Sequence, residues 1–215
     1  MTHFQPHAHA DEAVPQTAGR VLHGAVWYDA VSRYFLRRSE ASIQLLAQVK
    51  AGDKVLDVGC GPGQLTLAAQ GWAGPSGEAH GIDPSPEMIT VARRNAAKRG
   101  LPAQFQLGVV EALPFPDAMF DAVLSRLMLH HLPGDLKQRG LGEMRRVLKP
   151  EGLCLVLDFA PPRGGHWLHM AHHFIGPMMH VDVREYVPLL ETAGFTQVET
   201  GSTGFWLLAY VRGRG

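Results

Sequence analysis

Residues 54–64 read Lys-Val-Leu-Asp-Val-Gly-Cys-Gly-Pro-Gly-Gln, and this stretch decides the expected fold. Its first five residues are mostly β-branched or apolar, which is typical of a buried strand. Gly59, Gly61 and Gly63 follow at alternate positions, and the apolar residues after them have helical spacing. Glycines let the backbone approach a bound molecule closely, and the next helix directs its first free N–H groups into the same gap. The stretch therefore predicts a strand, a ligand-binding turn and a helix.

The glycine spacing narrows the class of ligand. A dinucleotide site has the pattern G-x-G-x-x-G, but position 64 is Gln. A phosphate-binding P-loop ends in Gly-Lys-Ser/Thr, a triplet that this sequence lacks. Asp83 follows at the end of a second apolar run, where an acid can accept hydrogen bonds from the two hydroxyls of a ribose. The pattern indicates a nucleoside ligand without a pyrophosphate.

This pattern resembles the class I methyltransferases that use S-adenosylmethionine. The resemblance is strengthened by Ile-Asp-Pro-Ser-Pro-Glu-Met at 82–88, Glu-Ala-Leu-Pro-Phe at 111–115, Phe-Asp at 120–121 and Arg-Val-Leu-Lys-Pro-Glu-Gly at 146–152. The most similar group is the ubiquinone/menaquinone biosynthesis C-methyltransferase (methyltransferase type 11) group. The resemblance covers roughly residues 50–160, and it implies the family more strongly than the methyl acceptor, because function varies on a shared fold.

Strands alternate with helices along the chain, which predicts a parallel sheet with helices on both faces. Strands are expected at 54–58, 78–83, 104–107, 121–125 and 153–159, and a terminal hairpin at 196–200 and 205–211. The resemblance implies an α/β fold with a Rossmann-like, seven-stranded, mostly parallel sheet whose last strand is antiparallel. Ligands of such sheets bind outside the carboxyl ends of the strands.

Local signals mark the ends of two of the expected helices. Ser85 is a predicted N-cap with proline at the first helical position, and Gly100 is expected to end the same helix. Asp135 and Gln138 have the spacing of a capping pair at the start of a later helix.

The expected domain organisation is a single domain with a short tail. Residues 1–19 contain few large apolar side chains and are expected to form a flexible tail. Residues 20–215 are expected to form one methyltransferase domain. An N-terminal helical cap at 20–50 is predicted as two pieces that break near 37–39. The resemblance implies a substrate lid inserted at 160–181.

Composition limits the partners. The chain has 20 basic and 20 acidic residues, so no overall charge draws it to nucleic acid or to an anionic membrane. No window approaches the ~18 apolar residues that span a bilayer, which leaves only a peripheral membrane contact open. Cys60 and Cys154 are interpreted as reduced residues, so a cytoplasmic location is expected. The oligomeric state does not follow from the sequence.

The resemblance implies a set of cofactor-binding residues around the glycine turn and the strand ends. Asp57 and the glycines are expected around the methionine part of S-adenosylmethionine, Asp83 at the ribose and Met88 against the adenine. Tyr28 is either a cofactor contact or ordinary packing. The full expected set is Tyr28, Asp57, Gly59, Cys60, Gly61, Gly63, Asp83, Pro84, Met88, Val110, Glu111 and Ser125.

One position departs from the family pattern. Family members present an acid to the adenine amino group within a G-D-A-E-like stretch, but this chain reads Gly-Val-Val-Glu at 108–111, with Val109 at the acidic position. Either the backbone of Val110 together with Glu111 contacts the adenine, or packing alone holds it.

His130 and His131 are the candidate catalytic residues. A sulfonium donor is already activated, so methyl transfer requires in-line positioning of the acceptor more than acid–base chemistry. A base is needed only if the acceptor must lose a proton. One of the two histidines is hypothesised to face the acceptor as a base or hydrogen-bond partner. The alternative is that one caps nearby backbone and the other is exposed.

The histidine-rich lid raises the question of a metal. If residues 164–180 are helical, His166, His169 and His173 share one face and could bind zinc. No Cys takes part and no H-E-x-x-H motif occurs, so no metal is expected. The aromatic and methionine side chains of the same segment favour a lid that encloses an apolar acceptor.

The sequence thus predicts an S-adenosylmethionine-dependent methyltransferase that transfers a methyl group by SN2 displacement to a small or lipid-like apolar acceptor. The alternative is a catalytically weak or inactive S-adenosylmethionine-binding regulatory or partner subunit. Methylation of nucleic acid is disfavoured, because it calls for a basic patch with aromatic residues that the balanced charge does not indicate.

Overall fold

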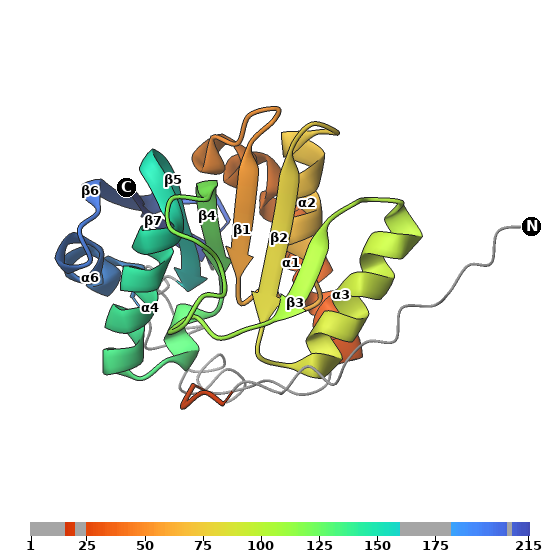
Figure 1. Ribbon diagram of the computed structural model, residues 1–215, viewed down its shortest axis with the longest axis horizontal. Coiled ribbons are helices and arrows are strands. Elements are labelled where there is room, and N and C mark those ends of the chain that lie inside the picture. The colour runs from red at the N-terminus through yellow and green to blue at the C-terminus, as the bar shows by residue number, and fades with distance from the viewer. Residues whose placement is uncertain (1–15, 20–24, 160–181, 206–207) are drawn as a thin grey trace, which may run out of the picture.

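The computed structural model describes residues 16–19, 25–159, 182–205 and 208–215, except for the side chains at 25–28, 30, 31 and 35. Within these ranges the chain forms one seven-stranded sheet in the order β3-β2-β1-β4-β5-β7-β6, with helices on both faces (Figure 1). In the same ranges no helix is both long enough and apolar enough to cross a membrane.

The sheet is parallel except at its C-terminal strands. The strands are β1 Lys54–Val58, β2 Glu78–Asp83, β3 Gln104–Leu107, β4 Phe120–Arg126, β5 Leu148–Phe159, β6 Thr196–Ser202 and β7 Leu208–Arg214. The pairs β1·β2, β1·β4, β2·β3 and β4·β5 are all parallel. β7 runs antiparallel to both β5 and β6. The predicted Rossmann-like, mostly parallel α/β sheet is therefore confirmed.

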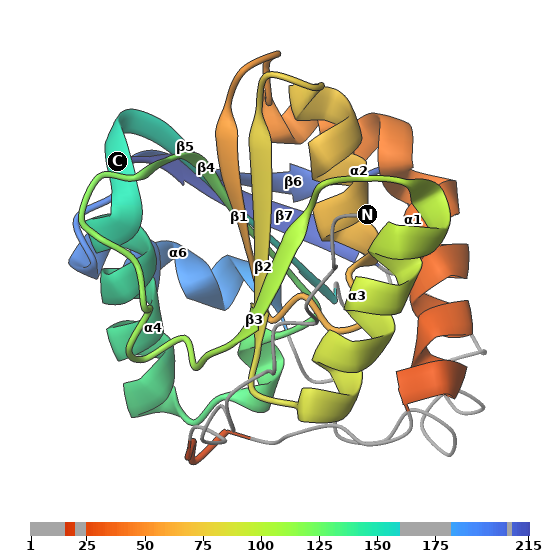
Figure 2. The ribbon, with the colours of Figure 1, turned by 45° about the vertical axis from the view of Figure 1, so that its right-hand side comes forward.

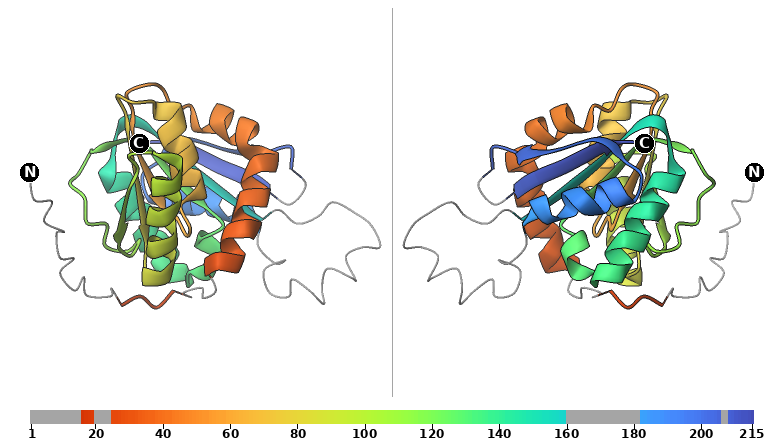
Figure 3. Two further views of the ribbon diagram at one scale, coloured as in Figure 1. Left: turned by 90° about the vertical axis from the view of Figure 1, so that its right-hand side faces the viewer. Right: turned by 90° about the vertical axis from the view of Figure 1, so that its left-hand side faces the viewer.

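Helices cover the two faces of the sheet in separate groups. They are α1 Ala25–Ala47, α2 Gln64–Ala73, α3 Pro86–Arg99, α4 Gly134–Val147 and α6 Val187–Thr192, with short 3₁₀ helices η1 Leu129–His131 and η3 Val183–Tyr186. Figure 2 shows the sheet nearly edge-on between α4 and α6 on one side and α1, α2 and α3 on the other. The two panels of Figure 3 bring each group forward in turn.

The alternation of side chains along β1 explains why its sequence is almost continuously apolar. Val55 packs in the core under α1 and α2, whereas Leu56 and Val58 pack in the core under α4 and α6. Successive strand residues point to opposite faces, and both faces are covered. A strand of this kind has no solvent face on which polar residues would alternate.

Helix α1 corrects the prediction of two pieces that break near residues 37–39. The helix is continuous, because Leu36, Ser39, Ile43 and Ala47 recur every three or four residues and are all buried. The charged residues at 37, 38 and 40 lie among positions that are exposed or partly exposed. Their polarity reflects the outer face of one helix and not a gap between two.

The ends of α3 agree with the sequence signals. The Ser85 hydroxyl accepts a hydrogen bond from the N–H of Met88 at 3.3 Å. At the other end, Gly100 is left-handed with φ +62°, and its N–H bonds to the carbonyl oxygens of Ala96 and Ala97. Both predicted boundaries of this helix are therefore confirmed.

The predicted capping pair of α4 is wrong. Its N-cap is Pro133, which provides no side-chain hydrogen bond, and Asp135 lies inside the first turn. Gln138 instead donates to the carbonyl oxygen of Leu189 at 3.4 Å. Asp135 still suits this place, because a carboxylate near a helix N-terminus interacts favourably with the helix dipole.

A buried polar cluster ties α1 to the glycine turn. The carboxylate of Asp29 accepts from Gln64 Nε2 at 2.6 Å and from Asn95 Nδ2 at 3.0 Å, and it also pairs with Arg33. Asn95 Nδ2 donates in addition to the carbonyl oxygen of Pro62 at 3.0 Å. One amide thus holds the first part of α1 and the turn against α3.

Only part of the expected N-terminal cap lies within the described residues. Trp27 and Tyr28 lie in α1, but their side chains are outside the described set. The lid predicted at 160–181 also lies outside the described residues, and so does most of the tail predicted at 1–19. The tail, the cap as a cofactor-covering element and the lid stay predictions.

We expect the Asn95→Ala variant to lose about 1–3 kcal/mol of unfolding free energy, because buried acceptors on Asp29 and Pro62 lose a donor. Urea unfolding measures this loss. The matched control is Lys98→Ala, an exposed position on the same helix that should change stability by less than about 0.5 kcal/mol. Equal effects of the two substitutions would contradict the importance of this cluster.

Candidate functional site

The glycine turn is fastened to the end of β2. The N–H groups of Gly59 and Cys60 both bond to the carbonyl oxygen of Ile82 at 2.9 Å. The N–H of Gly61 donates to Asp83 Oδ2, also at 2.9 Å. Gly59, Gly61 and Gly63 have φ values of +73°, +52° and +80°. Since left-handed backbone is costly for other residues, the alternating glycines are required for this path.

Two of these glycines also make space for neighbouring side chains. A Cβ atom added at Gly63 would lie 2.7 Å from Phe105 Cε1, and one added at Gly59 would lie 2.3 Å from Met128 Cγ. Gly63 therefore allows α2 to pack tightly against β3. Gly59 allows the segment after β4 to lie directly on the turn.

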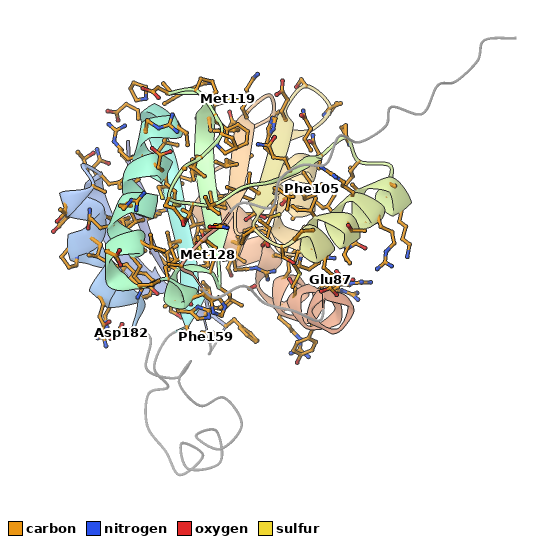
Figure 4. The ribbon with its side chains drawn as sticks, turned by 60° about the horizontal axis from the view of Figure 1, so that its bottom comes forward. Glu87, Phe105, Met119, Met128, Phe159 and Asp182 are labelled. Carbon is orange, nitrogen blue, oxygen red and sulfur yellow. The ribbon has the colours of Figure 1, made fainter. Side chains whose placement is uncertain are left out.

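A pocket opens at the carboxyl ends of β1, β2, β3 and β4. Figure 4 shows Met128 and Phe159 at this end of the sheet and Met119 at the opposite end. Among the residues expected from the sequence, the pocket is lined by Gly59, Gly61, Asp83, Pro84, Met88, Val110, Glu111 and His131. The structure brings these together from four different strand ends and the segments that follow them.

Other lining residues were not predicted as site residues. They are Thr17, Gly19, Val58, Ile82, Gly108, Val109, Leu127, Met128 and Leu132. Most are neighbours of predicted residues and could have been found by extending each motif by one or two positions. Thr17 and Gly19 carry no such signal. They come from the N-terminal segment, where an added Cβ at Gly19 would lie 2.9 Å from Leu132 Cδ2.

Several predicted residues support the pocket from outside its lining. Asp57 Oδ2 accepts from the Thr66 hydroxyl at 2.7 Å, and the Ser125 hydroxyl donates to the carbonyl oxygen of Val58 at 3.0 Å. The side chain of Cys60 is buried in the apolar cluster between α2 and α3. Gly63, as described above, packs against β3. These residues hold the turn and the strand ends together, and none of them belongs to the pocket wall.

Asp83 is the anchor of the pocket. Besides accepting from Gly61, its carboxylate accepts from the N–H of Ser85 at 2.9 Å. Burial raises the pKa of Asp83, and the two backbone N–H groups oppose that rise. Each oxygen uses one lone pair in these bonds, so each can accept one more hydrogen bond from a ligand.

Asp57 carries an unfavourable charge below the turn. Burial raises its pKa to about 6, while the Thr66 hydroxyl and the nearby guanidinium of Arg126 limit the rise. At neutral pH the carboxyl group is therefore ionised at a cost to stability. The folded protein binds the proton more tightly than the unfolded chain does.

Val109, at the position expected to be acidic, and Glu111 both line the pocket. Val109 is buried and pairs with Ala112 in an isolated β-bridge, which turns the chain back at this point. Glu111 also lines the pocket, and its Oε2 atom is buried without a hydrogen-bond partner in the described structure. The bridge therefore brings a carboxylate two positions later into the wall that Val109 leaves apolar.

The two candidate catalytic histidines occupy different environments. His131 lines the pocket. The side chain of His130 is 3% exposed, and its Nδ1 lies 2.8 Å from Asp158 Oδ1. Its Nε2 is buried and makes no hydrogen bond to the described residues. His130 bonds to Asp158 through both its ring and its backbone N–H, and both interpretations of the pair stay predictions.

Asp158 and Tyr186 were not predicted as site residues. Asp158 lies within the apolar run of β5 and is fully buried. The Tyr186 hydroxyl donates to Asp158 Oδ2 at 3.0 Å from η3. A lone carboxylate inside an apolar strand was the available signal, because buried charges need partners.

No metal site emerges from the part of the chain that the structure describes, where no three His, Cys, Asp or Glu side chains are grouped suitably. The zinc alternative named His166, His169 and His173, which lie outside the described residues. The absence of a metal therefore stays a prediction.

We expect Gly63→Ala to lower the free energy of unfolding by about 2 kcal/mol or more, because its left-handed backbone and its contact with Phe105 exclude a Cβ. Gly142→Ala is the matched control. Gly142 lies within α4 with open space at its Cβ, so alanine should stabilise the protein by about 0.5–1 kcal/mol. Chemical denaturation distinguishes the two, and effects of the same sign would refute this account of the turn.

We expect Asp57→Asn to stabilise the protein at neutral pH. A raised folded-state pKa means that stability falls as the pH rises from the unfolded value of 3.8 to about 6. A shift of about two units corresponds to about 3 kcal/mol, which the asparagine avoids. Urea unfolding at pH 7.5 and pH 4.5 should give an advantage of the variant that falls to about 1 kcal/mol at the lower pH. A pH-independent difference would be inconsistent with an ionised Asp57.

Comparison with known proteins identifies the domain. Residues 55–152 match the methyltransferase domain family. The chain is 41% identical over 120 residues to a demethylmenaquinone methyltransferase from Thermus thermophilus, covering 56% of this chain and 53% of that protein. It is 43% identical over 114 residues to a ubiquinone/menaquinone biosynthesis C-methyltransferase from Bordetella avium, covering 53% and 44%. The chain thus matches about half the length of these relatives.

Solved structures share the fold over a larger part of the chain. An S-adenosylmethionine-dependent methyltransferase from Aquifex aeolicus superposes with a TM-score of 0.74 at 23% identity, covering 90% of this chain and 99% of that one. The YcgJ protein from Bacillus subtilis gives a TM-score of 0.61 at 27% identity, covering 77% and 70%. The sheet order, the glycine turn fixed to Asp83 and these matches agree: residues 55–152 match the methyltransferase domain family, and the chain shares the fold of the solved structures.

Proposed function

We propose that this protein is an S-adenosylmethionine-dependent methyltransferase that acts on a small or lipid-like apolar acceptor, for which a quinone-type ring is the best candidate. The observation that carries the proposal is the pocket itself. It joins the glycine turn, the Asp83 carboxylate and the unpartnered Glu111 Oε2 at the carboxyl ends of the central strands. The names of the two curated relatives support a quinone-type acceptor.

The pocket residues fit the adenosyl group of the cofactor. That group offers two ribose hydroxyls and one adenine amino group as donors. Asp83 has lone pairs left for the hydroxyls, and Glu111 Oε2 is a buried acceptor that lacks a donor. Met88 and Val110 supply apolar surfaces for the flat ring. Donors on the ligand thus meet acceptors on the protein.

The glycine turn fits the methionine part. Gly59 and Gly61 line the pocket with backbone and add no side chain to it. The bound cofactor would supply a methyl group on a positively charged sulfur. The carboxylates of Asp57 and Asp83 lie at the turn and make the local environment favourable for that charge.

The remaining wall of the pocket is suited to an apolar acceptor. Leu127, Met128 and Leu132 follow β4 and place aliphatic and thioether surface beside His131. An aromatic or prenylated acceptor would gain from burial on such a surface. The protein's task is then to hold the acceptor in line with the methyl group and to exclude water.

The alternative is an S-adenosylmethionine-binding subunit without catalysis, and the valine at position 109 is the observation in its favour. A transfer assay separates the two functions. A donor with an isotopically labelled methyl group, incubated with a short-chain demethylmenaquinol, should yield labelled product and S-adenosylhomocysteine. Calorimetric binding of S-adenosylhomocysteine without transfer to this acceptor, or to any compound of a cell extract, would favour the subunit.

We expect Glu111→Gln to weaken binding of S-adenosylhomocysteine by about 10-fold or more, since a hydrogen bond to a charged group contributes about 1.5–3 kcal/mol. The inosyl analogue, which has an oxygen in place of the amino group, should bind the wild type weakly. The glutamine amide can donate to that oxygen, so the preference for the adenosyl ligand over the inosyl ligand should be smaller in the variant than in the wild type.

Isothermal titration of both ligands into both proteins provides the measurement. Glu191→Gln, an exposed position on α6, is the control and should leave both affinities unchanged. If Glu111→Gln retains the wild-type preference between the two ligands, then Glu111 does not contact the adenine amino group.

A further inference from the structure

We propose that Asp158 and Tyr186 position His130 as the base that removes a proton from the methyl acceptor, and that the acceptor is therefore an aromatic or enolic hydroxyl compound. The inference rests on the proposed methyltransferase function and adds to it a base, its two positioning residues and a chemical class of acceptor. It is carried by a buried hydrogen-bond network that lies beside the pocket.

The carboxylate of Asp158 is surrounded by donors. Its Oδ1 accepts from the His130 ring at 2.8 Å and from the N–H of Phe159 at 2.9 Å. Its Oδ2 accepts from the Tyr186 hydroxyl at 3.0 Å and from the backbone N–H of His130 at 3.3 Å. Four donors occupy the four lone-pair positions of an ionised carboxylate. A proton on Asp158 would displace one of them.

This arrangement fixes the tautomer of His130. Because Asp158 accepts, Nδ1 must carry the hydrogen, and in the neutral ring Nε2 then presents a lone pair. That atom is buried and makes no hydrogen bond to the described residues. A buried polar atom without a partner is unfavourable for the free protein. Such a cost is expected where a ligand provides the missing partner.

Tyr186 stabilises the network as a permanent donor. Burial and the negative charge of Asp158 raise the pKa of Tyr186 well above its ordinary value, so its hydroxyl keeps its proton. The other charged groups near it are Glu185, which adds to the rise of the pKa, and Lys137, whose ammonium lies 5.6 Å from the ring centroid. Tyr186 reaches Asp158 from η3, on the face of the sheet that α4 and α6 cover.

His130 is next to the pocket. Its ring lies 3.9 Å, centroid to centroid, from the ring of His131, which lines the pocket wall. On another side Phe159 lies 5.3 Å away. Figure 4 shows Phe159 at the same end of the sheet as Met128. The ring that carries the unpartnered nitrogen therefore packs directly against a residue of the pocket wall.

The chemistry balances without another reactant. The hydroxyl proton of the acceptor moves to His130 Nε2, and the electron pair that remains is delocalised onto the ring carbon or the oxygen. That pair forms the bond to the methyl carbon, while the carbon–sulfur bond breaks and its pair stays on sulfur. If carbon is methylated, the ring loses the proton of that carbon to water and becomes aromatic again. After methylation of carbon, His130 returns its proton to the ring oxygen, which is left as an oxyanion, and after methylation of oxygen it returns its proton to solvent.

The first test needs no substrate. In protein labelled with ¹⁵N-histidine, long-range ¹H–¹⁵N spectra report which ring nitrogen carries the proton, and His130→Gln assigns the signal. We expect wild-type His130 to carry it on Nδ1. Asp158→Asn, whose amide can donate to Nδ1, should shift the proton to Nε2. A wild-type His130 with its proton on Nε2 overturns the proposal outright.

The second test measures transfer to a short-chain demethylmenaquinol. Asp158→Asn and His130→Gln should lower kcat by about 10²–10⁴-fold, the usual contribution of a general base. Tyr186→Phe should lower it less, by about 3–10-fold, because the phenol acts only through Asp158. The affinity for S-adenosylhomocysteine should change less than about 3-fold. The di-O-methyl ether of the quinol, which has no hydroxyl proton, should not be methylated.

The outcomes separate this inference from the proposed function. If the wild-type protein does not bind S-adenosylhomocysteine, the proposed function is contradicted, but the tautomer of His130 can still be measured. If folded Asp158→Asn keeps the wild-type turnover, the role of His130 as a base is contradicted, but the proposed methyltransferase function is not. Thermal unfolding of each variant checks folding, and if a variant does not fold, the wild-type tautomer and the quinol ether still decide.

Discussion

The hydrogen bond from the Gly61 N–H to the Asp83 carboxylate is the contact on which the site depends. It closes the turn after β1 onto the end of β2, together with the two N–H groups that share the Ile82 carbonyl oxygen. The position of this turn sets the direction of α2, whose first residues pack against α3 and α1. It also places backbone, and no side chain, on the floor of the pocket. The Asp83 carboxylate therefore connects the arrangement of β1 and β2 to the position of the pocket.

The sequence predicted the parts of this arrangement that rest on local rules. The strand, the left-handed glycines and the Ser85 cap follow from the conformational preferences of neighbouring residues. Local polarity was misleading where exposed charged residues lie in sequence between the buried residues of one continuous element. Charged residues near 37–40 suggested a break in α1, although they only face outward. Similarly, the strand was expected to begin at residue 153, whereas β5 already begins at Leu148.

The site was predictable only as far as its contacts are close in sequence. Asp83 and the glycines belong to one strand-turn-helix-strand unit, so spacing was sufficient to find them. Asp158 receives donors from His130 and Tyr186, each 28 residues away in opposite directions. Only folding brings these three together. Ser125 and Asp57 failed as pocket residues for a related reason, because spacing places a residue at a strand end but does not tell which way its side chain points.

Buried polar groups distinguish supporting residues from functional ones. Asp29 and Asp158 are buried carboxylates whose oxygens are occupied by protein donors, and such groups stabilise the structure around them. Within the described residues, the buried side-chain atoms that lack a hydrogen bond are Glu111 Oε2 and His130 Nε2. One lies in the pocket wall and the other is one ring behind it. Proteins tolerate an unpartnered buried atom where its partner arrives with a ligand.

The negative charge of the buried Asp57 affects the reaction cycle of the proposed enzyme. Asp57 is ionised at neutral pH although its burial makes this unfavourable, and the cost falls on the free protein. A sulfonium donor brings a positive charge to this side of the pocket, whereas its demethylated product is neutral. The same carboxylates thus attract the donor more than the product, because only the donor offsets their charge. The ionised Asp57 carboxylate lowers the stability of the ligand-free protein, and binding of the positively charged donor offsets this loss. Binding of the neutral product does not offset it, which favours exchange of product for donor after each transfer.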